Sequence, residues 1–269
     1  MKKLGIIMSV LLLVSFLPGV LSCGQAPTTP TRPTTPTTPT TPTKPTAPTT
    51  PTTEFKPIKI KFSYSTPPTG WTCVRAWVHW AKKIEEATNG RVKIDHYPSE
   101  SLHPLAQAYD SIKGGVTDIA WLSLSQNPGV FPLSEVGQLP FLNLPAGKVD
   151  GQTVGDGEIN SLIWYEFYET VPEIQAEWTK VKVLTLHKSS AFLPFTVKKP
   201  VRNVNDLKGF KLIVSGGPPT DMYKALGAVP VTSAPGDYYS NLEKGVVEGV
   251  SYAWAGMESY RLFELCRYW

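Results

Sequence analysis

The side chains best suited to catalysis or metal binding are scattered through this sequence. Its four histidines form no HxxxH or HExxH pair, and its three cysteines lie at no zinc or redox spacing. Residues 249–253, GVSYA, approach the GxSxG turn of serine hydrolases, but the phrase ends in alanine and no histidine follows Ser251. Glu85 and Glu86 fall on the predicted solvent face of a helix. We therefore expect no catalytic residue, no metal site, no cofactor and no enzyme activity.

Motifs and composition narrow the remaining classes of function. The sequence contains neither a Walker phosphate loop nor a GxGxxG fingerprint. Its formal net charge is +4, but lysine and arginine are spread along the chain, so no nucleic-acid partner is expected. Eight tryptophans and eleven tyrosines suit core packing, and they equally suit a cleft that binds sugars or aromatic solutes.

The first 22 residues have the pattern of an export signal. Lys2 and Lys3 precede an apolar run over residues 4–21, and the text Leu21-Ser22-Cys23 resembles the lipobox of bacterial lipoproteins. That resemblance implies cleavage before Cys23 and a lipid on its side chain. A transmembrane anchor or an ordinary secretory signal is the alternative, but the run is shorter than the roughly 20 residues of a comfortable helical crossing.

Residues 23–56 are predicted to be a stalk. Between Ala26 and Thr53 the chain is almost only threonine and proline. Such a segment has no side chains for a core, and its prolines favour polyproline II at about 3 Å per residue. We expect a semi-rigid spacer that holds a domain away from a membrane; its glycosylation stays open.

The region that follows begins as a βαβ unit. Residues 58–64 alternate apolar and polar side chains, which is typical of a strand with one covered face. An amphipathic helix then ends at Asn89-Gly90, and residues 91–97 return as a strand. A short helix over 105–113 and a buried strand over 117–121 come next. We expect one long helix over 153–178, bent near Pro172, and a strand over 181–186 that crosses to a second lobe.

Residues 203–249 are predicted to form a second α/β unit. A strand over 210–214 precedes a helix capped by Thr220 or Asp221 and ended by Gly227. Residues 229–231 contain Pro230 and are predicted to be an edge strand. A helix over 237–244 and a strand over 246–250 complete the unit. Cys73 and Cys266 show no motif spacing, so buried thiols are favoured over a disulfide.

Several phrases in this order resemble one family. DLKG over 206–209, GAVPV over 227–231 and GVVEG over 245–249 match the second lobe of the solute-binding receptors of tripartite ATP-independent periplasmic (TRAP) transporters, the DctP family. FPL over 131–133 and LPF over 139–141 match its first lobe. The resemblance implies a two-lobed, type II periplasmic-binding-protein fold of α/β class with a ligand cleft between the lobes.

The resemblance also implies boundaries and partners. We expect a first lobe over 57–183, a second over 184–250, and the start of a return to the first lobe over 251–269. Residues 266–269 fall inside a predicted amphipathic helix with no stop signal, so we expect a C-terminally truncated fragment. A receptor of this family delivers a small organic solute to a small and a large membrane subunit. A ligand sensor or scaffold lipoprotein uncoupled from transport is the alternative.

The expected class of solute follows from two departures from the family text. Ile213 stands where the family places an arginine that grips a carboxylate, and Leu193 stands near the position of a second basic residue. A buried carboxylate without a partner is costly, so we expect a neutral, aromatic, polyol-like or cationic solute. The alternative is that another cation, Lys188, Lys198 or Arg75, pairs with a carboxylate of the solute. The residues expected to bind the solute are Trp71, Ser123, Leu193, Ile213, Tyr239, Tyr252 and Trp254.

Overall fold

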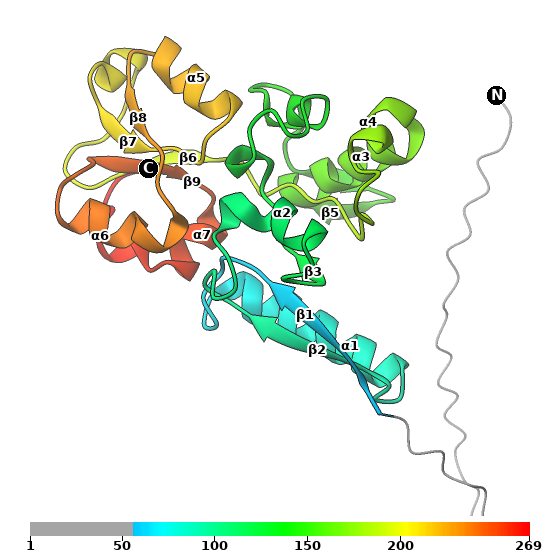
Figure 1. The fold of residues 1–269 in the computed structure, drawn as a ribbon. Helices are drawn as coiled ribbons and strands as arrows, with labels where there is room; N and C mark the ends of the chain where they lie inside the picture. Colours follow the sequence, from blue (N-terminus) through cyan, green and yellow to red (C-terminus); the bar gives the residue numbers. More distant parts are fainter. Residues whose placement is uncertain (1–55) are drawn as a thin grey trace, which may run out of the picture. The chain divides into compact units, whose positions relative to one another are not determined.

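A parallel sheet of three strands forms the first part of the fold. The computed structural model describes residues 56–269, so the predicted signal peptide, Cys23 and all but the last residue of the stalk lie outside the described residues. The strand order is β2-β1-β3, seen in blue to green in Figure 1. The strands are β1 (Ile58–Ser63), β2 (Val92–Tyr97) and β3 (Ile119–Ala120).

The predicted βαβ unit is confirmed. A π-helical turn over Cys73–Trp77 leads into α1 (Val78–Ala87), which covers one face of the sheet. Phe62 packs edge-on against Trp77, with ring centroids 5.5 Å apart, and Cys73 is buried beside it. The helix ends where Asn89 and Gly90 adopt φ of 51° and 73°, as the Asn-Gly pair predicts.

A second sheet of four strands carries most of the core. Its order is β6-β9-β7-β8; β7 is parallel to β8 and β9, and β6 is antiparallel to β9. The edge position of β8 is confirmed. The strands are β6 (Leu193–Thr196), β7 (Lys211–Ile213), β8 (Val229–Val231) and β9 (Gly249–Tyr252).

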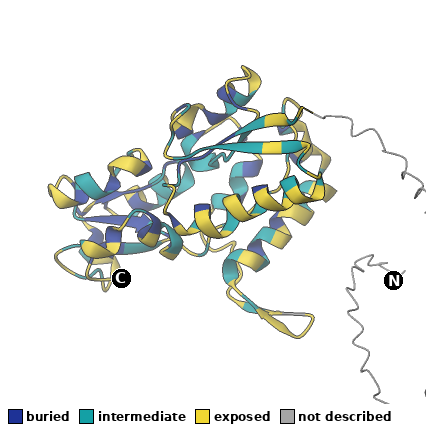
Figure 2. Ribbon diagram, turned by 90° about the horizontal axis from the view of Figure 1, so that it is seen from below, coloured by how far each residue is buried: buried dark blue, intermediate teal, exposed yellow. Residues whose placement is uncertain are grey.

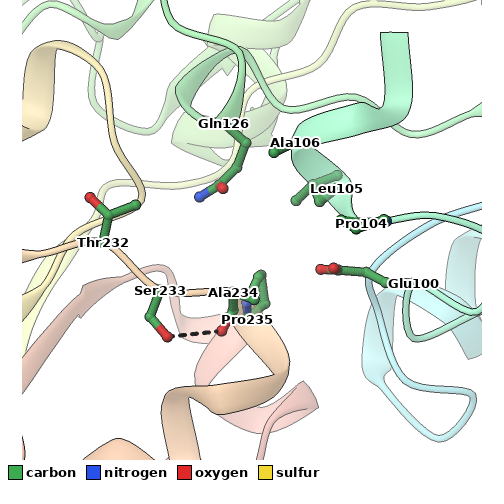
Figure 3. A pocket seen from close by; sticks show the side chains of 9 residues that line it. All are labelled: Glu100, Pro104, Leu105, Ala106, Gln126, Thr232, Ser233, Ala234 and Pro235. Atoms are coloured by element: carbon green, nitrogen blue, oxygen red, sulfur yellow. Dashed lines mark hydrogen bonds between the residues drawn. The ribbon is translucent and has the colours of Figure 1, made fainter. Parts of the chain in front are cut away.

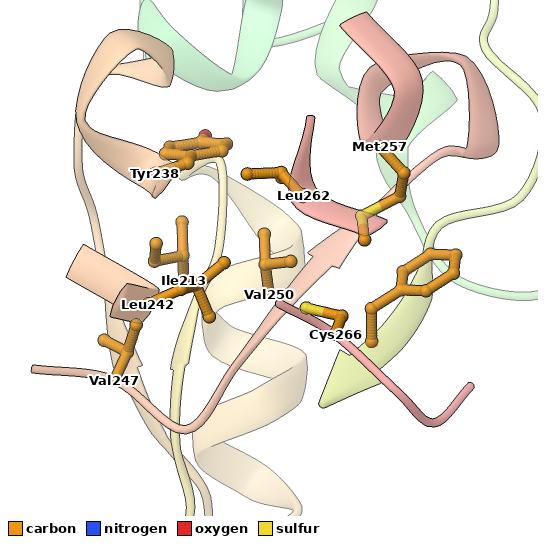
Figure 4. Packing of buried hydrophobic residues seen from close by; sticks show 9 residues of the cluster. Ile213, Tyr238, Leu242, Val247, Val250, Met257, Leu262 and Cys266 are labelled. Carbon is orange, nitrogen blue, oxygen red and sulfur yellow. The ribbon is translucent and has the colours of Figure 1, made fainter. Parts of the chain in front are cut away.

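Helices cover both faces of this sheet, which explains why the successive residues Leu212 and Ile213 of β7 are both apolar and buried. Ile213 packs in one cluster with Tyr238, Leu242 and Val250 (Figure 4), whereas Leu212 belongs to the cluster on the other face. Figure 2 shows the buried strands between helices whose outer surfaces are exposed. The covering helices are α5 (Pro218–Ala225), α6 (Tyr238–Glu243) and α7 (Trp254–Ser259). The α/β class is confirmed.

Residues 147–190 differ from the prediction. In place of one helix over 153–178 the chain forms a hairpin, then a helix that ends before Pro172 and a second helix that starts there. Proline cannot donate to the previous turn, but it fits the first position of a new helix. The four elements are β4 (Gly147–Val149), β5 (Gln152–Val154), α3 (Asp156–Thr170) and α4 (Pro172–Glu177). The strand predicted over 181–186 is wrong: this segment pairs with no strand in the described part of the chain.

Two helix ends also differ. Helix α5 starts at Pro218 after Gly217, so the cap predicted at Thr220 or Asp221 is wrong. The prediction of an amphipathic helix at the C-terminal end is wrong as well, because α7 ends at Ser259 and Arg261 takes a left-handed φ of 58°. Beyond it, Tyr268 forms a β-bridge with Thr196. The short helix α2 (Ala108–Lys113) is confirmed.

Cys73 and Cys266 are free and buried, as the sequence favoured. Within residues 56–269, no helix has the length and apolarity that a membrane crossing needs.

Candidate ligand-binding cleft

A cleft of about 280 Å³ lies between loops of the first sheet and the loop that follows β8 of the second sheet. One wall follows β2 and the other follows β8, so both walls are built at the carboxyl ends of strands, where α/β proteins usually bind ligands. Figure 3 shows the facing side chains. The lining residues are Glu100, Gln126, residues 104–106 and residues 232–235. The volume is close to the lower limit of about 300 Å³ for ligand pockets, so the cleft suits a small solute.

Loops from the two sheets also touch directly. The Gln126 side-chain amide donates to the Ser215 carbonyl at 2.6 Å, and the Tyr260 hydroxyl donates to the Ser65 carbonyl at 3.0 Å. Gly216 has φ of 107°, and a Cβ there would lie 2.2 Å from the Ser125 carbonyl oxygen. Only glycine therefore allows the loop after β7 to approach the first part of the fold this closely.

Three tyrosines pack together in the second part of the fold. The Tyr252 ring lies 5.4 Å from that of Tyr238 and 6.1 Å from that of Tyr260. Burial raises the pKa of Tyr252 well above its usual value and raises the pKa of Tyr260 to about 12. A Cβ at Gly256 would lie 2.1 Å from Tyr252 Cε1, so this glycine makes room for the ring. All three phenols stay neutral near pH 7 and offer aromatic faces and hydroxyl groups.

Glu100 is the only charged residue among those that line the cleft. It follows β2 in a turn where Ser99 and Glu100 have φ of 53° and 59°, an uncommon conformation for residues other than glycine. The Ser99 and Glu100 amides donate to the carbonyls of Thr66 and Tyr64, which fixes the turn against the end of β1. The Glu100 Oε1 atom is buried and has no hydrogen-bond partner among residues 56–269.

The structure brings three of the predicted binding residues together. Leu193 of β6 lies opposite Tyr252 of β9, and Ile213 of β7 is beside Val250 of the same strand β9. Ile213 has 0% of its surface exposed and packs in the core, so its side chain offers no contact to a solute in this conformation. The tyrosine Tyr252 is the member of this group that reaches the aromatic cluster next to the cleft.

None of the seven predicted residues lines the cleft, and the other four have different surroundings. Trp71 is 48% exposed, and Ser123 precedes a short turn at the end of the first sheet. The Tyr239 hydroxyl donates to Glu264 at 3.0 Å on the surface. Trp254 stacks on Phe263 and meets the Trp269 ring edge-on.

The cations named as alternative clamps are held elsewhere. The Lys188 ammonium donates to the Gly137 carbonyl and to the Asn143 side chain, and burial lowers its pKa. Lys198 and Arg75 have exposed side chains and do not line the cleft. Glu100 and residues 232–235 were missed by the sequence reasoning, although their places after β2 and β8 are a signal that could have found them.

A second aromatic group lies in the first part of the fold. Trp121 donates its indole N–H to His187 Nε2 at 2.7 Å, and the Trp77 ring lies 6.3 Å from the His187 ring. The edge of His187 reaches solvent, yet the surrounding rings desolvate it and lower its pKa. The buried Trp77 indole N–H meets no hydrogen-bond partner in the described part of the chain.

Groups able to catalyse a reaction are not assembled at the cleft. Ser251, the serine of the hydrolase-like phrase, is buried, and its hydroxyl accepts from the Tyr223 hydroxyl at 3.1 Å. No group of three or more metal-ligating side chains occurs among residues 56–269.

Known proteins resemble this chain over most of its described part. It is 32% identical over 157 residues to the outer membrane transporter protein TsaT of Comamonas testosteroni, covering 58% of this chain and 43% of TsaT. It is 22% identical over 213 residues to the 2,3-diketo-L-gulonate-binding periplasmic protein YiaO of Escherichia coli, covering 78% of this chain and 60% of YiaO.

Solved structures of TRAP solute-binding proteins also resemble this chain. A TRAP solute-binding protein from Rhodoferax ferrireducens with copurified benzoate matches with a TM-score of 0.70 and 28% identity, covering 78% of this chain and 62% of that one. A marine metagenome TRAP protein with 3-hydroxybenzoate matches with a TM-score of 0.71 and 28% identity, covering 79% and 62%. The two-lobed type II fold is thereby confirmed, and the chain spans less than two thirds of the length of these relatives.

The family model supplies the assignment. The model of the bacterial extracellular solute-binding proteins, family 7 (DctP), matches residues 62–269, which is more than half of the chain. The matched region begins near the end of β1 and contains the second sheet, the cleft and the tyrosine cluster. The chain therefore belongs to the family of bacterial extracellular solute-binding proteins, family 7.

Proposed function

We propose that this chain is the extracytoplasmic receptor of a TRAP-type secondary transporter. It captures a small organic solute in the cleft and delivers it to a small and a large membrane subunit. The observation that carries the proposal is a small cleft whose two walls come from the carboxyl ends of strands in different sheets. A solute that contacts both walls favours the closed arrangement of the lobes, and its differential affinity for that arrangement drives closure.

Attachment to the outer face of a membrane through a lipid on Cys23 belongs to this proposal. It is supported by the order of charged residues, apolar run, Leu21-Ser22-Cys23 and Thr/Pro stalk. One acyl chain binds a membrane weakly, whereas two or more bind it stably. The lipid on Cys23, rather than the folded domain, would therefore attach the protein to the membrane. In fractionated cells, Cys23→Ala is expected to release the protein or to leave an uncleaved precursor. Unchanged processing together with unchanged membrane attachment would rule out the lipid.

The solute is proposed not to be a simple mono- or dicarboxylate. Leu193 and Ile213 are apolar at the positions where the resemblance implies basic residues, and Ile213 is enclosed in the core. The relatives with solved structures hold benzoate and 3-hydroxybenzoate, which are aromatic monocarboxylates, so the proposal departs from them in the charge of the solute. Isothermal titration with C4 dicarboxylates, 2-oxo acids and sugar acids tests this: micromolar or tighter binding of any of them would contradict it.

A thermal-shift screen of small metabolites tests the receptor function itself. A solute that binds only the folded state raises the melting temperature by mass action. At a concentration one hundred times its Kd, it adds about 2.7 kcal/mol to the free energy of unfolding. We expect at least one small organic solute to do so. A chain that no metabolite stabilises would instead favour the scaffold alternative. Neighbouring genes for a small and a large multi-helix membrane subunit would separate a transport receptor from an uncoupled sensor.

A further inference from the structure

The loop between β7 and α5 meets the first part of the fold directly. We call its residues 215–217 the latch loop. The Gln126 side-chain amide donates to the Ser215 carbonyl at 2.6 Å. A Cβ at Gly216 would lie 2.2 Å from the Ser125 carbonyl oxygen, so this contact leaves no room for even a methyl group. The two parts of the fold therefore touch at the latch loop with no solute between them.

The latch loop has a backbone that glycine alone adopts readily. Gly216 has φ of 107°, and Gly217 has φ of 60° with ψ of −154°. A positive φ combined with an extended ψ is essentially restricted to glycine, and such conformations concentrate at switch regions and ligand sites. Pro218 and Pro219 follow at the start of α5, and the proline ring fixes φ near −65°. The loop is thus held in the shape that brings it against Ser125.

The surface that receives the latch loop is organised within the first part of the fold. The Ser125 hydroxyl donates to the Gln138 side-chain oxygen, which joins two 3₁₀ turns, Leu124–Gln126 and Ser134–Gln138. The Glu177 carboxylate of α4 accepts two backbone amides at the start of the second turn. None of these bonds involves the second sheet, so we expect the surface to keep its shape when the latch loop leaves it.

Two opposing effects make this contact reversible. The hydrogen bond between Gln126 and Ser215 stabilises it. Against this, the Gln138 Nε2 atom is buried and has no hydrogen-bond partner within the described chain. A Cβ at Gly217 would lie 3.9 Å from that nitrogen, so the latch loop covers it, and water can reach the amide only when the loop moves away. A buried donor without a partner costs free energy, and we therefore expect both the joined and the separated arrangement to be accessible.

We propose that the latch loop holds the two parts of the fold together in the solute-free protein and thereby sets how readily the cleft closes. The role rests on the proposed receptor function: apparent affinity for a solute rises with the fraction of molecules already in the binding-competent arrangement. Gln126 couples the two events, because it lines the cleft and also bonds to the latch loop. Gly216 does not line the cleft, so it is a positioning residue that acts through the approach of the loop.

A distance measurement between two spin labels tests the latch without any solute. Glu173→Cys on α4 and Ala225→Cys at the end of α5 place the labels at exposed positions beside the two contact surfaces. The thiols of Cys73 and Cys266 are buried, so the introduced cysteines are expected to take the label. Pulsed electron paramagnetic resonance on solute-free protein is expected to show one dominant separation, equal to that in the structure. A dominant longer separation would overturn the proposal.

Three variants of the labelled protein locate the latch. Gly216→Ala puts a methyl group against the Ser125 carbonyl and is expected to shift most molecules to longer separations. Gly209→Ala is the matched control: its φ is also positive, at 71°, but a Cβ there meets nothing within 4 Å, so the short separation should remain. Gln126→Ala removes the hydrogen bond without adding volume, and we expect a smaller shift in the same direction.

The outcomes separate the latch from the receptor function. Unchanged separations in folded Gly216→Ala, or in Gln126→Ala where the first variant does not fold, would overturn the latch, and so would equal opening by Gly209→Ala. Each of these results leaves the receptor function standing, because the measurement contains no solute. Conversely, a thermal-shift screen in which no metabolite stabilises the protein would contradict the receptor function without changing the label separations.

Discussion

Gly256→Ala is expected to displace the Tyr252 ring from the tyrosine cluster. The added Cβ would lie 2.1, 2.5 and 2.7 Å from Cε1, Cδ1 and Cζ of that ring. Non-bonded carbon atoms prefer separations of about 3.5–4.0 Å, so the ring has to move by about 1.5 Å. Forcing extra volume into a packed site costs about 1–3 kcal/mol. Against this, alanine is favoured over glycine inside a helix by about 1 kcal/mol.

These opposing terms make a double-mutant cycle the sharpest assay. In the Tyr252→Ala background the steric conflict is absent, so Gly256→Ala should stabilise the protein by about 1 kcal/mol. In the unsubstituted background the same change should be neutral or destabilising, which gives a coupling free energy of about 1–3 kcal/mol from urea unfolding. Equal stabilisation in both backgrounds would refute the placement of the Tyr252 ring against α7.

Two further predictions concern titratable groups that neighbouring side chains desolvate. Desolvation lowers the pKa values of His187 and His96 from their usual value, so the unfolded chain binds more protons than the folded one as the pH falls below 6.5. Stability is therefore expected to be fully present above pH 6.5 and to decline below it. The variant His187→Gln keeps a hydrogen-bond acceptor for Trp121, and its melting temperature should depend less on pH between 5 and 7. Identical pH profiles of the two proteins would contradict this. Cys73 and Cys266 are buried and free, and burial raises the pKa of Cys266 to about 11. Neither thiol should therefore react with a thiol-specific reagent at pH 8 until denaturant is added. Prompt reaction of the folded protein would disprove this prediction.

Local patterns predicted the elements whose own sequence carries the instruction. The alternation over 58–64 gave β1, and Pro230 gave the edge strand β8, because each pattern reflects a geometry that the residue itself imposes. The hairpin β4–β5 was missed although Asp150-Gly151 is a typical turn pair, since the apolar period over 153–178 was extended too far back. The segment 181–186 has strand-like text, but it lacks a pairing partner within the described chain.

The site was less predictable because it depends on distant contacts. The family resemblance placed Ile213 among the binding residues, yet α6 covers this position with Tyr238 and Leu242, and the side chain is enclosed. Glu100 reaches the cleft only because a left-handed turn is tied to β1 by two backbone hydrogen bonds. No spacing of residue types near position 100 encodes such a turn.

Hydrogen exchange with the most strongly stabilising solute tests the central claim that both sheets contact one ligand. Bound solute is expected to slow amide exchange at the same time in residues 99–106 of the first wall and residues 232–238 of the second, since both walls face the same cleft. The solute concentration that gives half protection should be equal for the two segments. Protection of only one wall, or protection confined to another part of the chain, would contradict a cleft that closes on its solute.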